Sequence, residues 1–231
     1  MSFENIKDNY SRLKGSIKEI CAECGRDPDQ IKLVAVSKTF SRKDIADLYE
    51  LVHRDFGENK VQELNEKEQA LRDKDIYWHL IGHLQTNKVK YVIDYVSLIH
   101  SVDCIKLAEE IQKRAAQSSK LIDILVQVNT SGEESKYGIN PVEAKELCNS
   151  ITAFENIRIK GLMTIGKFTD DEKEIRNNFK LLRSLYEELE PLHSDFEYLS
   201  MGMTSDYRIA IEEGSNLLRI GSAIFGERNY N

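Results

Sequence analysis

Short apolar runs alternate along the chain with longer segments that are apolar on one face only. The short runs have the length and the β-branched content of strands. They cover about residues 31–37, 55–59, 77–82, 97–102, 123–129, 157–165, 198–202 and 217–221. The longer segments carry apolar residues three and four positions apart, which predicts helices, and one such segment at about 2–24 precedes the first strand. Apolar strands separated by helices are typical of a parallel sheet buried on both faces.

Residues at the ends of the longer segments support this assignment. Ser41 is the expected N-cap of a helix whose apolar face extends to Val52. Asp103 is expected to cap a helix that reaches about residue 117, and Pro141 stands in the first turn of another. Gly214 is expected to end a helix at about 204–213. The remaining helices are expected at about 60–72, 85–92 and 170–189.

Eight strands with helical partners predict an α/β fold, a (β/α)₈ TIM barrel with an extra N-terminal helix. The alternative is a doubly wound open sheet, but no G-x-G-x-x-G follows the first strand. Because the chain has no linker or low-complexity segment, residues 1–231 are expected to form a single domain.

The composition narrows the possible functions. Charged residues make up 31% of the chain and the net charge is −7, with acids and bases interspersed. The absence of a basic stripe argues against a nucleic-acid partner. No apolar run is long enough to cross a membrane, and the N-terminus lacks the pattern of a secretory signal. We therefore expect a cytoplasmic protein with no membrane partner.

Cys21 and Cys24 form a C-x-x-C pair inside the expected first helix. No second cysteine pair or nearby histidine pair completes a metal site, so no metal is predicted. Reduced thiols are the simpler interpretation for a cytosolic protein.

Lys38 is the main candidate for chemistry because it closes the first apolar strand. The carboxyl ends of strands are where α/β barrels and open sheets keep their active sites. An amine at the edge of an apolar core has an easily lowered pKa and forms a Schiff base with a carbonyl compound. The alternative is a strand-end lysine whose amine simply reaches water.

The ends of the seventh and eighth strands suggest a phosphate site. Ser200 and Gly202 run into Ser205 at an expected helix start, and Gly221 with Ser222 ends the eighth strand. Barrels frequently bind phosphate with the loops after these two strands. Hydroxyls and unobstructed amides suit a phosphate dianion, although glycines also simply turn the chain. A phosphate site plus an amine indicates pyridoxal phosphate, or else a sugar phosphate held on the lysine.

A set of short motifs makes the chain recognisable. They are Val36-Ser37-Lys38, Phe56-Gly57-Glu58-Asn59, Trp78 to Lys88, Ser135-Lys136-x-Gly138, Gly161-Leu162-Met163, Ser200 to Asp206, and Arg219-Ile220-Gly221-Ser222. These motifs closely resemble those of the YggS/PROSC family of pyridoxal phosphate homeostasis proteins, and the resemblance runs from about residue 31 to 228.

The resemblance implies a barrel like the N-terminal domain of bacterial alanine racemase, with pyridoxal 5'-phosphate as cofactor. It implies Lys38 as the Schiff-base lysine, Arg219 facing the pyridine nitrogen and Asn59 near the ring. It also implies Ser200, Gly202, Gly221 and Ser222 as phosphate ligands; Ser222 stands where threonine is common and keeps the hydroxyl. Met163, at the end of the sixth strand, is either a contact of the cofactor ring or a barrel-core methionine.

Two features argue against efficient catalysis, so no catalytic residue is assigned. Arg219 is always protonated and gives up no proton to the ring nitrogen, which weakens the cofactor as an electron sink. Racemisation also needs a second base, for which only Tyr137 and Tyr207 are candidates, and alanine racemases take theirs from a further domain. We expect a monomer that buffers the cofactor and passes it transiently to apo-enzymes; an amino-acid racemase is the alternative.

Other polar residues are given structural interpretations. Lys136 is either a second aldehyde-reactive amine or an exposed loop lysine. His79 and His83 are expected to be hydrogen-bonded structural histidines rather than proton relays. The charged run from Glu63 to Glu68 is expected to be a solvated helix face.

Overall fold

The strands form a closed barrel in the computed structural model, which describes residues 2–133 and 135–227. All neighbouring strands are parallel, and β8 pairs with β1 to close the ring. The strands are β1 (Lys32–Val36), β2 (Asp55–Glu58), β3 (Tyr77–Leu80), β4 (Val96–Val102), β5 (Ile122–Gln127), β6 (Ile157–Met163), β7 (Tyr198–Ser200) and β8 (Leu217–Ile220). The predicted TIM barrel is confirmed, and the open sheet is excluded.

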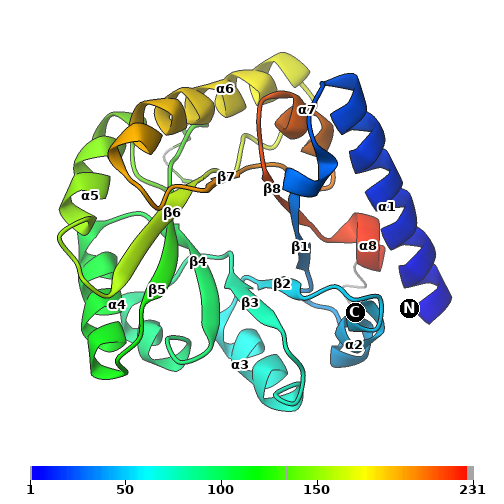
Figure 1. Ribbon diagram of the computed structural model, residues 1–231, viewed down its shortest axis with the longest axis horizontal. Coiled ribbons are helices and arrows are strands. Elements are labelled where there is room, and N and C mark those ends of the chain that lie inside the picture. The colour runs from blue at the N-terminus through cyan, green and yellow to red at the C-terminus, as the bar shows by residue number, and fades with distance from the viewer. Residues whose placement is uncertain (1, 134, 228–231) are drawn as a thin grey trace.

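Helices surround the ring of strands, and α1 lies along one side beside α7 and α8 (Figure 1). They are α1 (Phe3–Glu23), α2 (Arg42–Tyr49), α3 (Val61–Ala70), α4 (Ile105–Gln117), α5 (Ala144–Ile151), α6 (Glu172–Leu189), α7 (Tyr207–Glu212) and α8 (Ser222–Phe225). Short 3₁₀ turns cover Pro28–Gln30, Thr86–Tyr91, Pro141–Glu143 and Glu190–Leu192. None of the described helices is both long and apolar enough to cross a bilayer.

Alternate residues of the strands face the two sides of the barrel wall. In β1, Leu33 and Ala35 pack with the apolar residues between the barrel and the helices. Val34 instead belongs to a small cluster inside the barrel. Lys38 lies beyond this strand, in the turn that follows its carboxyl end.

Several helix ends differ from the sequence prediction. The helix that begins after Ser41 ends at Tyr49, because Val52 adopts a left-handed conformation (φ 65°) and is 77% exposed. Asp103 is not a cap, because Cys104 is extended and the helix begins at Ile105. The expected helix at 85–92 is a 3₁₀ turn, and the helix expected at 204–213 is the shorter α7.

Other end signals are confirmed. The Ser41 hydroxyl and the Asp44 carboxylate form a reciprocal capping box at α2. Pro141 opens a 3₁₀ turn that leads into α5. Gly214 has a φ of +99° directly after α7, the conformation that makes glycine common at this position.

Candidate functional site

The predicted site residues all lie at the carboxyl ends of strands or in the loops that follow. Because the strands are parallel and closed into a ring, these ends meet at one face of the barrel. Met163 and Ser200 end β6 and β7, and Arg219 lies near the end of β8; Lys38, Asn59, Gly202, Ser205, Gly221 and Ser222 follow β1, β2, β7 or β8.

Arg219 joins three neighbouring strands at this face. The residue is 4% exposed, and its guanidinium donates to the Ser200 hydroxyl (2.5 Å) and to the Thr164 carbonyl (2.7 Å). Burial lowers the pKa of Arg219 to about 10, while the nearby charge of Asp206 acts to raise it. A pKa of about 10 keeps the guanidinium protonated at neutral pH, so a positive charge is fixed at the β7–β8 side of the mouth.

The loops after β7 and β8 lie against each other. The Thr204 hydroxyl accepts the amide of Ala223, and the Asp206 carboxylate accepts the amide of Met203 at 2.6 Å. Burial raises the pKa of Asp206. The hydroxyl-bearing residues Ser205 and Ser222 are exposed at these two loops. The structure therefore brings Gly202, Ser205, Gly221 and Ser222 onto adjoining loops, whereas Ser200 is fully buried at the end of β7 and accepts from Arg219.

Gly202 is required by its surroundings. Its φ of +99° is unfavourable for other residues, and a β-carbon there would lie 2.6 Å from the β-carbon of Ala210. Gly221 directly follows β8, and a β-carbon there would lie 3.1 Å from the Val36 carbonyl oxygen. The two glycines therefore keep the chain close to α7 and to β1, respectively.

Lys38 is half-buried, and both of its neighbours in the chain are held by charged side chains. Lys67 donates to the Ser37 carbonyl at 2.8 Å, and Glu63 accepts the Thr39 amide at 2.6 Å. Lys67 is only 7% exposed, so the expectation of a fully solvated helix face from Glu63 to Glu68 is wrong. These contacts could not be predicted from the sequence, because alternating charges on a helix normally indicate a face that is exposed to solvent.

Asn59 and Met163 differ in how deeply they are buried in the barrel. Asn59 is partly exposed directly after β2, and a β-carbon on Gly82 would lie 2.2 Å from its carbonyl oxygen. Met163 is fully buried in the interior cluster that also contains Val34 and Leu98. Met163 is thus part of the barrel core, and a ring contact stays a prediction.

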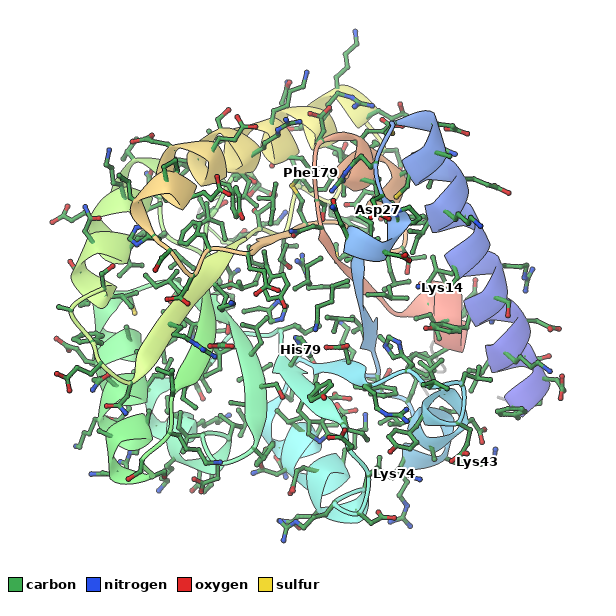
Figure 2. The ribbon with its side chains drawn as sticks, viewed as in Figure 1. Lys14, Asp27, Lys43, Lys74, His79 and Phe179 are labelled. Atoms are coloured by element: carbon green, nitrogen blue, oxygen red, sulfur yellow. The ribbon has the colours of Figure 1, made fainter. Side chains whose placement is uncertain are left out.

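A line of polar groups crosses the barrel interior below the mouth, with His79 near the middle of the ring (Figure 2). Asp55 accepts from Lys32 and from His79 Nε2, both at 2.9 Å. His79 Nδ1 therefore carries a lone pair, and His100 Nε2 donates to it at 2.9 Å. Burial lowers the pKa of both histidines. His79 is thus hydrogen-bonded inside the barrel, and its purely structural role stays a prediction.

The remaining candidates have partners at the rim. His83 and Tyr137 stack with ring centroids 3.9 Å apart. Tyr207 shares a hydrogen bond of 3.0 Å with Ser16 of α1, outside the barrel. Lys136 donates to the Gly166 carbonyl at 3.0 Å and is paired with a carboxylate of its own loop.

The described residues contain no cluster of three or more histidine, cysteine or acidic side chains able to hold a metal ion. Cys21 is buried, Cys24 is exposed, and neither forms a disulfide.

Comparison with known proteins identifies relatives along the whole chain. The family described as alanine racemase, N-terminal domain, matches residues 3–229. A protein of Aquifex aeolicus named pyridoxal phosphate homeostasis protein is 42% identical over 227 residues, which cover 98% of this chain and 100% of the relative. A protein of the same name from Vibrio alginolyticus is 37% identical, over 98% of this chain and 99% of the relative.

Solved structures agree with this relationship. PipY of Synechococcus elongatus, with PLP bound, superposes with a TM-score of 0.80 at 32% identity, over 91% of this chain and 100% of that chain. An alanine racemase of Clostridium difficile has a TM-score of 0.74 at 14% identity and is covered over 57% of its length, so this likeness shows the fold alone. The chain therefore belongs to the alanine racemase N-terminal domain family, together with the relatives named pyridoxal phosphate homeostasis proteins, as its motifs predicted.

Proposed function

We propose that this protein binds pyridoxal 5'-phosphate as a Schiff base on Lys38 and serves in intracellular homeostasis of the cofactor, without efficient catalysis. The observation that carries the proposal is that three features lie at the carboxyl-end face of the barrel: a half-buried lysine after β1, a buried guanidinium on β8, and two adjoining loops that contain hydroxyls and glycines. The names of the relatives and the PLP-bound PipY structure support it.

The donors at this face fit the cofactor. In the proposal, Lys38 supplies the amine and Arg219 faces the ring nitrogen, with Asn59 beside the ring and Met163 beneath it. The phosphate is assigned to the β7 and β8 loops, through Ser200, Gly202, Ser205, Gly221 and Ser222. When bound, the cofactor supplies an aldehyde carbon that is electrophilic toward amines. Exposed hydroxyls next to close-packed glycines suit a dianion that approaches the backbone closely.

Two observations favour storage over turnover. A guanidinium with a pKa of about 10 stays protonated and has no proton to share with a ring nitrogen at neutral pH. Tyr207, one candidate for a second base, is engaged by Ser16 outside the barrel. An amino-acid racemase therefore remains the alternative that the experiments below must reject.

The proposal extends to the organisation of the protein. We propose that residues 1–231 act as one cofactor-binding domain, as a monomer in the cytoplasm. Its macromolecular partners would be apo-forms of pyridoxal-phosphate enzymes that take up the cofactor transiently.

Absorption spectroscopy tests the cofactor and its lysine. The purified protein is titrated with pyridoxal phosphate before and after borohydride, next to Lys38→Ala and to Lys43→Ala, a control at an exposed lysine of α2. We expect a visible band in the wild type and the control that borohydride removes, and no such band in Lys38→Ala. Absence of the band in the wild type rejects cofactor binding, whereas a band retained in Lys38→Ala rejects only the assigned lysine.

Exchange of the amino-acid α-proton tests the proposal that the protein does not catalyse efficiently. The cofactor-loaded protein is incubated in D₂O with each amino acid, and deuterium at the α-carbon is followed by NMR. We expect exchange at most slightly above that of free pyridoxal phosphate. Exchange at an ordinary enzymatic rate, about 1–1,000 per second, would establish the racemase alternative.

A further inference from the structure

The turn that carries Lys38 is held in a strained conformation. The Phe40 amide donates to the Ser37 carbonyl at 3.0 Å, which closes a four-residue turn from Ser37 to Phe40. Thr39, the third residue of this turn, has a φ of 70°, whereas Lys38 is not among the described residues with positive φ. This is the pattern of a type II turn, whose third position normally requires glycine or asparagine. A β-branched residue there is strained.

A cluster of charged side chains contacts the turn on both sides of Lys38. Lys67 of α3 donates to the Ser37 carbonyl at 2.8 Å, and Glu63 of α3 accepts the Thr39 amide at 2.6 Å. These two side chains are themselves paired at 2.7 Å. The peptide before Lys38 and the peptide after it are therefore fixed by one ion pair.

The cluster continues into the barrel wall. Glu58 of β2 is fully buried, accepts from the Ser37 hydroxyl at 2.6 Å and pairs with Lys67 at 2.8 Å. Lys67 thus lies between two carboxylates, and one of them is anchored on a strand. Both bonds go to Glu58 Oε1, and Glu58 Oε2 is buried without a hydrogen-bond partner. Moving Lys67 away would leave Glu58 as an unpaired buried charge, which is costly.

The two contacts act on the conformation of one peptide. In a type II turn the peptide between the second and third residues has the opposite orientation from that in a type I turn. Rotation of the Lys38–Thr39 peptide to type I would relieve the strain at Thr39 and would break the bond from its amide to Glu63. The ion pair therefore opposes a relaxation that the threonine favours. This relaxation would change ψ of Lys38, and the side-chain rotamers open to a residue depend on its φ and ψ.

We infer that Glu63 and Lys67, supported by Glu58, are positioning residues that hold the turn in its type II form and so direct the Lys38 amine toward the barrel mouth. This inference rests on the proposed function of Lys38. It predicts that the clamp, defined here as Glu58, Glu63 and Lys67, determines how readily the protein takes up pyridoxal phosphate. Strain of this kind persists where the surrounding structure over-determines it.

The first test removes the clamp. Glu63→Gln and Lys67→Met are compared with Glu66→Gln, which changes an exposed carboxylate on the same helix. We expect the pyridoxal phosphate affinity, read from the visible band, to fall about tenfold in the first two variants and to stay unchanged in the third. In the cofactor-free protein, hydrogen exchange of the Thr39 amide measured by NMR should accelerate in Glu63→Gln only.

A rescue separates positioning from a general loss of stability. In the double variant Thr39→Gly with Glu63→Gln, glycine adopts the left-handed conformation without strain and needs no clamp. We expect this variant to regain most of the wild-type affinity without regaining the wild-type melting temperature. Failure of a folded double variant to regain affinity, or wild-type affinity in Glu63→Gln alone, overturns the inference. If the wild type itself shows no band, the proposed function has failed instead, and the amide exchange still reports on the clamp.

Discussion

The two sides of the barrel mouth each contain a residue in the left-handed conformation, but they stabilise it in different ways. On the β7–β8 side this residue is Gly202, which has no strain to overcome and leaves no room for a β-carbon. On the β1–β2 side it is Thr39, which is strained and is held by the charges of Glu63 and Lys67. One side is fixed by close packing and the other by electrostatic contacts.

The buried cations of the two sides, Arg219 and Lys67, differ in the same way. Arg219 donates to neutral acceptors, the Ser200 hydroxyl and the Thr164 carbonyl. Lys67 is instead paired with two carboxylates. Close packing tolerates little change of volume, whereas a network of charges responds to changes in charge and pH. Substitutions that add atoms should therefore destabilise the β7–β8 side most. Substitutions that change charge should destabilise the β1–β2 side most.

The largest effect is expected from adding one carbon on the β7–β8 side. In Gly202→Ala the new β-carbon would lie 2.6 Å from that of Ala210, at a backbone φ of +99°. The strain and the overlap should together lower the free energy of unfolding by about 4 kcal/mol. Urea denaturation measures this value.

The matched control is Gly15→Ala in α1, where a β-carbon meets no atom within 4 Å. This change should stabilise the protein by about 1 kcal/mol, because alanine has the higher helix propensity. Equal stabilities of the two variants would show that the packing around Gly202 is not restrictive.

The stability of the fold at acid pH should be limited mainly by buried histidines. The His53 Nε2–H donates to the Asp55 carbonyl, and the Tyr10 hydroxyl donates to His53 Nδ1. Burial lowers the pKa of His53 to about 4. In the unfolded chain this histidine binds a proton below about pH 6.5, whereas in the folded chain it does so only near pH 4. The free energy of unfolding therefore decreases as the pH is lowered from about 6.5 to 4. His53 alone should account for about 3 kcal/mol, and His79 and His100 shift in the same direction.

Urea denaturation at a series of pH values between about 7 and 4 measures this loss. His53→Gln should flatten the profile. Tyr10→Phe keeps the imidazole and removes its hydroxyl partner, so it should lower stability near pH 7 and flatten the profile less, because the lost bond favoured the neutral imidazole. A profile that is equally steep in His53→Gln would assign the acid sensitivity to other groups.

A smaller effect is expected from removing a neutral acceptor on the β7–β8 side. Ser200→Ala leaves one Arg219 donor without its buried partner. This should cost about 2 kcal/mol of stability, with little dependence on pH above 5 or so because no carboxylate takes part. Ser150→Ala, at an exposed hydroxyl that bonds to its own helix, should change stability by less than about 0.5 kcal/mol. Similar losses in both variants would mean that the bond to Arg219 contributes nothing specific.

The barrel and the strand ends could be predicted because they depend on local periodicity. Alternating apolar strands and amphipathic helices define the order of elements, and strand parity places Arg219 on the inner side with Leu217. The end of the first strand places Lys38 at the same face of the barrel. The glycines and hydroxyls after β7 and β8 could be recognised from their positions alone. Their mutual contact, from Thr204 to Ala223, required only that the two strands be neighbours.

The clamp could not be predicted, because its contacts cross between distant segments. Lys67 is buried only because α3 packs beside β2 and the end of β1. The sequence of this helix instead predicts a charged face exposed to solvent. The line from Asp55 through His79 to His100 likewise depends on the register of three strands. Conformations such as the left-handed Val52 lack the glycine or asparagine that would signal them.

Val52 offers the smallest and most direct test of the role of strain. Like Thr39 it is β-branched and left-handed, with a φ of 65°, but it is 77% exposed, and its amide bonds only within its own turn, to the Tyr49 carbonyl. Val52→Asn should stabilise the protein by about 1 kcal/mol, because asparagine tolerates this conformation and no packing is lost. Val142→Asn, at an exposed valine without positive φ, should give no such gain in the same thermal denaturation experiment. If both variants behave alike, left-handed strain is not what distinguishes these positions, and the argument that Thr39 needs a clamp loses its physical basis.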